Sequence, residues 1–242
     1  MTALPWTRRP LIGFDLETTG VDVETALIVT ASVVRWGGGQ LTSVHNWTSN
    51  LDGAEIPASA TEIHGITTAQ ARAAGRPAAE VVAQIVETLT MYTAFGWPVV
   101  AMNAQFDCTI LERECERHGV RSLWDRPPVV LDPRVLDKQM DRFRRGRRRL
   151  VDLCQHYGVE MDGGAHNSEV DARAACGVVW KLGERNRTLQ RMGLLDLHRA
   201  QEVWAREQDA SFRAYQFQRT GTADLSPFGW PLVPRPDLAE LT

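Results

Sequence analysis

The sequence predicts an α/β fold in which a mixed sheet of five strands is flanked by helices. Three β-rich segments follow one another near the N-terminus, and segments of helical periodicity then alternate with two short apolar segments. The chain has 242 residues, of which 43% are hydrophobic and 24% are charged. This length is sufficient for one α/β domain with a sizeable core and an appendage.

The first three predicted strands are consecutive in the chain. Residues 11–16 are apolar, residues 27–36 are rich in β-branched side chains, and residues 40–47 follow a turn of three glycines. We expect these segments to form an antiparallel meander. Two shorter apolar segments, residues 99–102 and 129–131, complete the predicted sheet.

Helices are predicted between and after these strands. The longest early one starts at Pro77, which suits a first helical turn, and carries apolar side chains at helical spacing from Val81 to Leu89. A later one starts with Ser168 as its cap. The remaining predicted helices span residues 57–66, 69–73, 108–118 and 150–157, and the last helix of the main domain spans 168–182.

The sequence indicates a boundary near residue 185. Residues 1–185 are expected to form the main domain, and residues 186–242 a helical extension whose role the sequence does not indicate. Helical patches cover residues 189–206, and the Pro-rich tail that follows is expected to be weakly ordered.

Charge and cysteine content limit the function classes. The net charge is −3, so the whole molecule is not a cationic surface for nucleic acid. Of the 27 basic residues 25 are Arg, and six of these lie within Arg142–Arg149. This cluster is expected either to contact phosphates or to form a solvated loop. The four cysteines show no metal-binding spacing, and we find neither a secretory segment nor a membrane-spanning one, which predicts a cytoplasmic protein that does not contact membranes.

Asp15 and Glu17 end the first predicted strand. Residues two apart on a strand point to the same side, so these two carboxylates can converge. Two adjacent carboxylates raise each other's pKa, and a divalent cation with oxygen ligands removes that penalty. A solvated strand end is the alternative explanation.

Two later motifs carry further candidates. Asp107 ends the segment Asn103–Asp107, which follows a strand and opens a helix, so it lies where strand ends meet the cleft of an α/β sheet. Asp171 lies in the first turn of a predicted helix, and His166 precedes it in a glycine-flanked loop. Taken singly, Asp107 is also explained as a helix N-cap, Asp171 as a partner of the helix dipole, and His166 as a solvated loop residue.

Together, in this order, the motifs resemble those of the DEDDh 3′–5′ exonucleases, the DnaQ-like group that includes the proofreading exonuclease subunit of bacterial DNA polymerase III. The match lies at Phe14–Gly20, Asn103–Asp107 and His166–Asp171, with a fourth at Ile63–Thr67, and covers about residues 10–183. The resemblance implies a ribonuclease H-like fold. One departure is Glu169, an extra carboxylate that either perturbs metal affinity or faces solvent.

The resemblance implies two divalent metal ions, Mg²⁺ or Mn²⁺, held by Asp15, Glu17, Asp107 and Asp171. By family practice Asp15 contacts both ions. Such a pair stabilises the attacking and leaving oxygens of a phosphodiester. His166 would be the general base that accepts the proton of the attacking water.

The resemblance also implies substrate contacts. The terminal nucleotide would be bound by Thr18, by the loop that contains His64, and by Asn103 and Phe106. For Phe106, a position in the hydrophobic core is an equally supported alternative. The expected product is a nucleoside 5′-monophosphate, released from the 3′ end of single-stranded DNA in proofreading or repair.

Two other function classes stay open at this point. The first is the same chemistry on RNA or short oligoribonucleotides, as in the RNase T and oligoribonuclease branches, because the motifs do not report on the 2′-hydroxyl. The second is a non-catalytic module that binds nucleic acid or a polymerase, although such a module has no use for a carboxylate cluster. A DNA polymerase subunit is a possible protein partner.

Overall fold

The computed structural model describes residues 4–162 and 166–235 and confirms the predicted mixed five-stranded sheet. The strand order is β3-β2-β1-β4-β5. β1 pairs antiparallel with β2 and parallel with β4, while β2–β3 is antiparallel and β4–β5 parallel. The strands are β1 (Pro10–Thr18), β2 (Ile28–Gly37), β3 (Ser43–Thr48), β4 (Val99–Val100) and β5 (Val130–Leu131).

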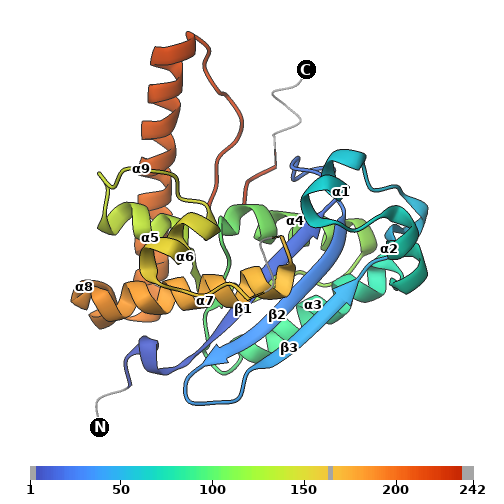
Figure 1. The fold of residues 1–242 in the computed structure, drawn as a ribbon, viewed down its shortest axis with the longest axis horizontal. Helices are drawn as coiled ribbons and strands as arrows, with labels where there is room; N and C mark the ends of the chain where they lie inside the picture. The colour runs from blue at the N-terminus through green and yellow to red at the C-terminus, as the bar shows by residue number, and fades with distance from the viewer. Residues whose placement is uncertain (1–3, 163–165, 236–242) are drawn as a thin grey trace.

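Helices lie on both faces of the sheet (Figure 1). In chain order they are α1 (Ala58–His64), α2 (Thr68–Ala74), α3 (Ala78–Thr93), α4 (Ala104–His118), α5 (Pro133–Met140), α6 (Leu150–Tyr157), α7 (Ser168–Arg185), α8 (Arg187–Arg191) and α9 (Leu194–Thr220). Short 3₁₀ turns lie at Trp6–Arg8, Leu51–Gly53 and Leu123–Asp125.

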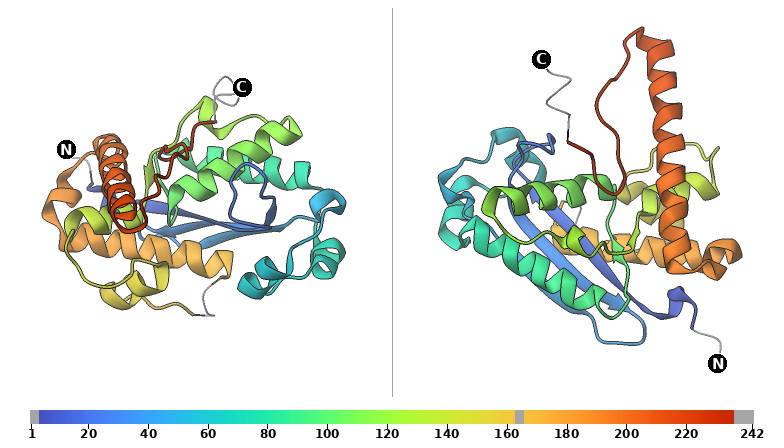
Figure 2. Two further views of the ribbon diagram at one scale, coloured as in Figure 1. Left: turned by 90° about the horizontal axis from the view of Figure 1, so that it is seen from above. Right: turned by 180° about the vertical axis from the view of Figure 1, so that it is seen from behind.

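The view from above shows α4 on one side of the strands and α7 on the other (Figure 2). The core beneath α3 and α4 includes Phe14 of β1, Ile85 and Leu111, all buried. The core beneath α7 includes Leu11 of β1 and Val178. β1 is buried on both faces. Its sequence is therefore apolar at nearly every position, apart from Asp15, Glu17 and the final Thr18.

Gly13 of β1 lets α7 approach the sheet closely. A Cβ atom at this position would lie 2.4 Å from the carbonyl oxygen of Ala172, which is in α7. Such a separation is far below a van der Waals contact, so only glycine fits. The close approach sets the distance between the middle of β1 and the first turns of α7.

The starts of α4 and α5 differ from the sequence prediction. α4 begins at Ala104 rather than near Cys108, because Asn103 adopts a left-handed conformation (φ 61°, ψ 49°) and serves as the N-cap. Asp107 is therefore in the first turn and is not the cap. The helix α5 was not predicted, although Asp132 as N-cap followed by Pro133 at the first helical position is the signal that indicates it.

The C-terminal extension packs on the main domain. α9 is longer than predicted and runs beside α5, and its far end projects from the body of the molecule (Figure 1). The tail then returns to α4, where Trp230 is buried and the backbone N–H of Val233 donates to the Thr109 hydroxyl at 2.9 Å. The expectation of a weakly ordered tail therefore does not hold for this described part of it.

None of the helices within residues 4–162 and 166–235 combines the length and the apolar character needed to cross a bilayer. All four cysteines are buried and free.

Candidate active site

The strand β1 positions the first two acids. Asp15 pairs opposite Ser32 of β2 and Glu17 opposite Thr30, so both side chains project from the same face. The register shifts between Glu17 and Thr18, where β1 ends in a bulge. The Thr18 hydroxyl donates to the Gly20 carbonyl at 2.8 Å, which fixes the turn that follows.

The helix α4 brings Asp107 to β1. Its Oδ1 accepts a hydrogen bond from the backbone N–H of Leu16 at 3.0 Å, between the two acids of the strand. The side chain is buried, with 4% of its surface exposed. This one contact joins residues 91 positions apart and fixes the third carboxylate beside the first two.

The first turn of α7 supplies Asp171. Asn167 caps this helix, and the hydroxyl of Ser168 shares a 2.7 Å hydrogen bond with Ser32 of β2, which holds the helix start over the sheet. His166 has a left-handed backbone (φ 65°), and its N–H donates to Asp171 Oδ2 at 3.2 Å. The other oxygen, Asp171 Oδ1, is buried and has no hydrogen-bond partner within the described residues.

Each of the four carboxyl groups has a raised pKa. Burial is the main cause at Asp15, and the negative charges of Asp107, Asp171 and Glu17 add to it. Burial and the charge of Asp171 raise the pKa of Glu17 to about 7. Burial also raises the pKa of Asp107 and of Asp171, although hydrogen bonds from Leu16 and His166 act in the opposite direction.

These groups line one cleft of about 500 Å³. Its walls are the acids, the turn after β1, the α1 segment around His64, and the start of α4. Of the four predicted substrate-binding residues, Thr18, His64 and Phe106 line this cleft. Asn103 lies outside the cleft lining and instead lines a neighbouring cavity, where its side-chain oxygen accepts from Arg134 at 2.7 Å.

The donor set fits divalent metal ions. One ligand atom each from Glu17, His166 and Asp171 lie within 4.8 Å of one another. Burial is the largest cause of each raised pKa, and the charges of neighbouring acids add to it at Asp15, Glu17 and Asp107, so a bound cation would stabilise the ionised carboxylates. Oδ1 of Asp171 is a buried acceptor that has no partner among the described residues. Carboxylate oxygens are the ligands that Mg²⁺ and Mn²⁺ prefer.

Asp132 is a positioning residue that sequence reasoning missed. It is 2% exposed, and its carboxylate accepts hydrogen bonds from the backbone N–H groups of Asn103, Ala104 and Arg134. These contacts hold the left-handed turn that starts α4 and therefore aims Asp107. The Asp-Pro pair was visible in the sequence, but its contact with a turn 28 positions earlier was not.

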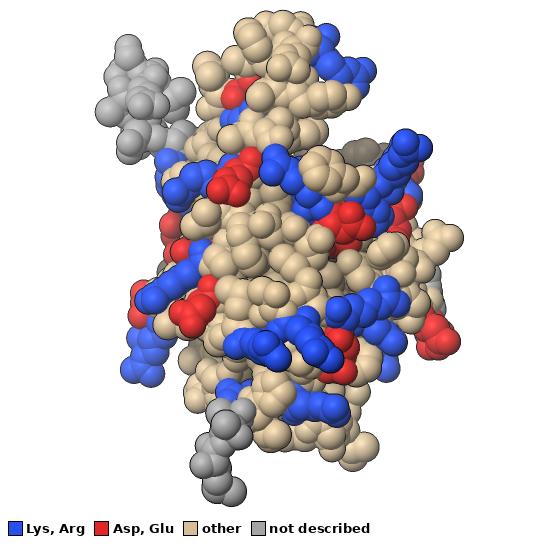
Figure 3. All heavy atoms as spheres, turned by 90° about the vertical axis from the view of Figure 1, so that its left-hand side faces the viewer, with Lys and Arg blue, Asp and Glu red and all other residues tan. Residues whose placement is uncertain are grey.

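The arginine cluster at 142–149 is partly structural. Arg144 and Arg148 both pair with the fully buried Asp137, at 2.9 and 2.7 Å, and Tyr157 donates its hydroxyl to the same carboxylate. The molecular face at the left of Figure 1 carries Lys and Arg interleaved with Asp and Glu (Figure 3). Of the two expectations for the cluster, phosphate contact or a solvated loop, neither describes Arg144 and Arg148, which are paired within the protein.

Glu169, the extra carboxylate of the last motif, does not line the cleft. Its two oxygens are engaged by Asn46 at 2.9 Å and Arg173 at 3.4 Å. It is thus paired on the outer side of α7 rather than added to the metal-binding set.

The sequence matches the RNase_T family, described as Exonuclease, over residues 12–179, which is more than half of the chain. The chain belongs to this exonuclease family. The match contains all four acids and His166, and it ends before α8 and α9. The predicted exonuclease family and its ribonuclease H-like fold are therefore confirmed, and the DnaQ-like subgroup stays a prediction.

Solved structures of exonuclease I share the fold. One is 19% identical with a TM-score of 0.65, and the match covers 74% of this chain and 42% of that chain. The enzyme from Methylocaldum szegediense is 20% identical with a TM-score of 0.61, over 74% and 41% of the two chains. Escherichia coli exonuclease I in complex with a dA16 oligonucleotide is 19% identical with a TM-score of 0.61, over 74% and 42%.

The matched part of this chain thus covers less than half the length of these proteins. Comparison with curated proteins gives no match.

Proposed function

We propose that this exonuclease removes nucleoside 5′-monophosphates from the 3′ end of single-stranded DNA with the help of two divalent metal ions. The observation that carries the proposal is the convergence of Asp15, Glu17, Asp107, Asp171 and His166 in one cleft. These residues come from three distant parts of the chain, and no structural role requires mutually repelling acids at one point.

Asp15, Glu17, Asp107 and Asp171 would hold the ions, with Asp15 at the centre of the set. Its position is supported by the charges of the other three acids, which all act on its carboxyl group. Two bound Mg²⁺ or Mn²⁺ ions would stabilise the negative charge that develops on the attacking and leaving oxygens.

His166 is placed to act as general base. Its side chain is exposed to the cleft, and its backbone is held against Asp171. As a neutral imidazole it accepts the proton of the attacking water, and the neighbouring carboxylates stabilise the imidazolium that forms.

Apolar side chains give the cleft its affinity for bases. Ile63 is 54% exposed although it is a large hydrophobic residue, and it lines the cleft together with Val21, Met102 and Phe106. Apolar and aromatic contacts with bases are tolerant of sequence, which suits an enzyme that removes any terminal nucleotide.

Single-stranded DNA is the favoured substrate because E. coli exonuclease I, which shares the fold, has been solved with dA16 and dT13 oligonucleotides. A role in proofreading or repair stays a prediction, and the possible DNA polymerase partner gains no support from these relatives. A cytoplasmic location is consistent with four free cysteines and stays a prediction.

The test compares single-stranded DNA and RNA of one sequence, labelled at the 5′ end, with a free or a phosphorylated 3′ end. Each is incubated with Mg²⁺, with Mn²⁺ and with EDTA. We expect stepwise shortening of the 3′-hydroxyl DNA with either metal, and none with EDTA. The Asp15→Asn variant is the matched control because it keeps the side-chain size and removes one charge.

Release of products from the 5′ end, or equal activity in EDTA, would contradict the proposal. Faster cleavage of the RNA would replace DNA by RNA as the substrate and leave the chemistry in place. Nucleic-acid binding without any cleavage would favour the non-catalytic module.

A further inference from the structure

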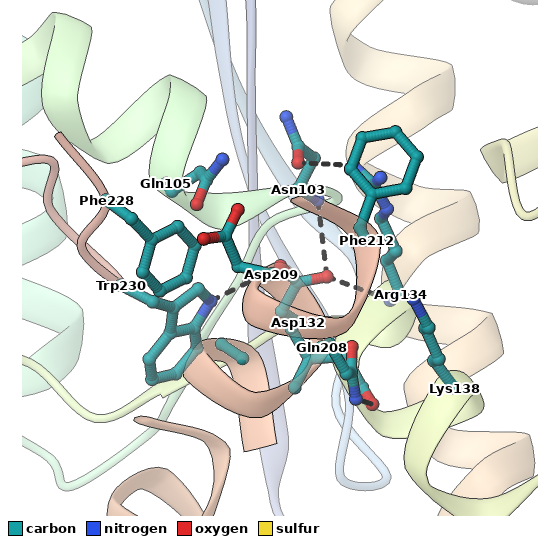
Figure 4. A pocket seen from close by; sticks show the side chains of 12 residues that line it. Asn103, Gln105, Asp132, Arg134, Lys138, Gln208, Asp209, Phe212, Phe228 and Trp230 are labelled. Atoms are coloured by element: carbon teal, nitrogen blue, oxygen red, sulfur yellow. Dashed lines mark hydrogen bonds between the residues drawn. The ribbon is translucent and has the colours of Figure 1, made fainter. Parts of the chain in front are cut away.

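A second cavity lies beside the active-site cleft. It has a volume of about 110 Å³ and lies between the start of α4, the helix α5, the helix α9 and the returning tail. Figure 4 shows Phe212 of α9 beside Arg134 and Asn103, and Phe228 of the tail beside Trp230 and Asp209. The cavity therefore has two aromatic walls with polar and cationic groups between them.

Three cations lie on α5 or just after it: Arg134 and Lys138 are in the helix, and Arg142 follows two residues beyond its end. Within the described residues, Arg134, Lys138 and Arg142 form no ion pair with a carboxylate within 4.0 Å. Lys138 also lines an adjoining hollow of about 310 Å³ together with Arg142. Burial lowers the pKa of Lys138, and so do the positive charges of Arg134, Arg148 and Arg142, while the negative charge of Asp209 acts in the opposite direction. A bound anion would relieve this crowding of like charges.

The acids of the cavity are already engaged. Asp132 accepts backbone N–H groups at the starts of α4 and α5, and Asp209 pairs with Arg213 at 2.6 Å. Among the described residues, Arg134 and Lys138 therefore remain without a direct carboxylate partner on the α5 side of the cavity, while Glu207 lines the adjoining hollow. This asymmetry favours a phosphate over a cationic ligand.

Phe212 provides a surface for a base. Its side chain is 50% exposed on α9, although a large aromatic residue normally gains free energy by burial. Exposed aromatic rings next to cations are the usual arrangement in grooves that bind single strands, because the rings stack with bases and the cations bind phosphates.

The two cavities share one wall. Met102, Phe106 and Asp107 line the active-site cleft, whereas Asn103 and Gln105 of the same segment line the second cavity. A strand whose 3′ end lies in the cleft reaches the second cavity by passing over the start of α4.

We propose that the second cavity binds a nucleotide of the single strand upstream of the 3′ end, with its phosphate on Arg134, Lys138 and Arg142 and its base on Phe212. This inference rests on the proposed function. It gives the C-terminal extension a role, since Phe212 and Phe228 lie beyond residue 179, where the family match ends.

The test measures steady-state kinetics on two substrates, a single-stranded DNA of about twelve nucleotides and the p-nitrophenyl ester of thymidine 5′-monophosphate, with Mn²⁺ present. Only the long substrate can reach the second cavity. For Phe212→Ala and Lys138→Ala we expect the KM for the oligonucleotide to rise about tenfold, with kcat and hydrolysis of the ester unchanged. Lys138→Ala also reduces the slope of log KM against log salt by about one.

Phe217→Ala and Lys181→Ala are the matched controls, because Phe217 lies on the same helix with 54% exposure and Lys181 is the other lysine of the chain. If the wild type cleaves both substrates and all four variants keep its KM, the inference is overturned and the proposed function stands.

If the wild type cleaves neither substrate, the proposed function fails. The inference is then tested by the affinity of the variants for the oligonucleotide. Fluorescence anisotropy measures this affinity with the labelled oligonucleotide. We expect Phe212→Ala and Lys138→Ala to bind more weakly than the two control variants. Equal affinities would overturn the inference.

Discussion

At the scale of single residues, the candidate active site is a cluster of buried acids whose raised pKa values predict that the metal-free protein is less stable at higher pH. Glu17 titrates at about 7 instead of its ordinary 4.5 because it is buried and faces Asp171. The unfolded chain ionises these acids at lower pH than the folded chain does. Stability is therefore fully present at acidic pH and is lost as the pH rises through the folded pKa values.

The dependence of folding stability on pH can be tested without any activity measurement. In EDTA, the melting temperature should fall between about pH 5 and about pH 8, and Mn²⁺ should raise it more at the higher pH. Asp15→Asn should flatten both effects, because it removes the charge at the centre of the cluster. Differential scanning calorimetry of the two proteins checks this, and a metal-free melting temperature that rises with pH would contradict it.

His166 carries a second prediction at this scale. His166→Ala should lower kcat by roughly 10²–10⁴-fold, the usual size of general-base catalysis. The measurement is the rate at saturating oligonucleotide over a range of pH. An unchanged rate would remove His166 from the mechanism.

The acids and His166 were predictable because each lies in a short motif whose order along the chain is informative. Asp132 and Asp137 were not, since their roles depend on partners that the fold brings from elsewhere. A buried carboxylate that receives backbone N–H groups looks the same in sequence as one at the surface.

At the scale of elements, the site depends on how closely α7 approaches β1. Gly13 permits this approach, and the first turn of α7 carries Asp171. We expect Gly13→Ala to push the helix away, to cost about 1–3 kcal/mol of folding free energy, and to separate Asp171 from Glu17. The variant should bind Mn²⁺ more weakly than the wild type does.

Urea unfolding and Mn²⁺ titration of the variant check this prediction. Gly20→Ala is the control for stability, since a Cβ atom there meets nothing within 4 Å. Equal stability and metal affinity in Gly13→Ala would show that the helix position does not set the site.

Hydrophobic periodicity was sufficient for the strands and for the long helices α3 and α7. It failed at α4, whose first turn is set by Asn103 and its contact with Asp132, and at α5, which has only eight residues. In both cases local capping chemistry, and not the apolar pattern, determines where the helix begins.

At the scale of the whole molecule, the extension is joined to the sheet through buried polar contacts. Gln201 of α9 is fully buried, accepts from the backbone N–H of Asp132 at 2.8 Å and donates to the carbonyl of Val130 at 3.1 Å. These two hydrogen bonds pair backbone groups along the free edge of β5, the last strand of the sheet.

Gln201→Leu should therefore destabilise the whole protein by about 2–4 kcal/mol, because two buried backbone groups lose their partners. Gln218→Leu on the exposed part of the same helix is the matched control and should be within about 0.5 kcal/mol of the wild type. Chemical unfolding followed by far-UV circular dichroism measures both, and equal stabilities would mean that the extension is an independent unit.

The sequence indicated that a helical extension exists but not where it packs. Its apolar residues are spread thinly along a long helix, and the tail contacts α4 through Trp230 and Val233, which no local pattern connects to that helix. The boundary near residue 185 stays a prediction.

The most direct test of the metal site is anomalous diffraction from crystals grown with Mn²⁺ and thymidine 5′-monophosphate. We expect anomalous peaks enclosed by the carboxylates of Asp15, Glu17, Asp107 and Asp171, with the product phosphate beside them. Density maps in which Mn²⁺ is absent from this cleft, or lies only elsewhere on the molecule, would contradict the assignment of these four acids.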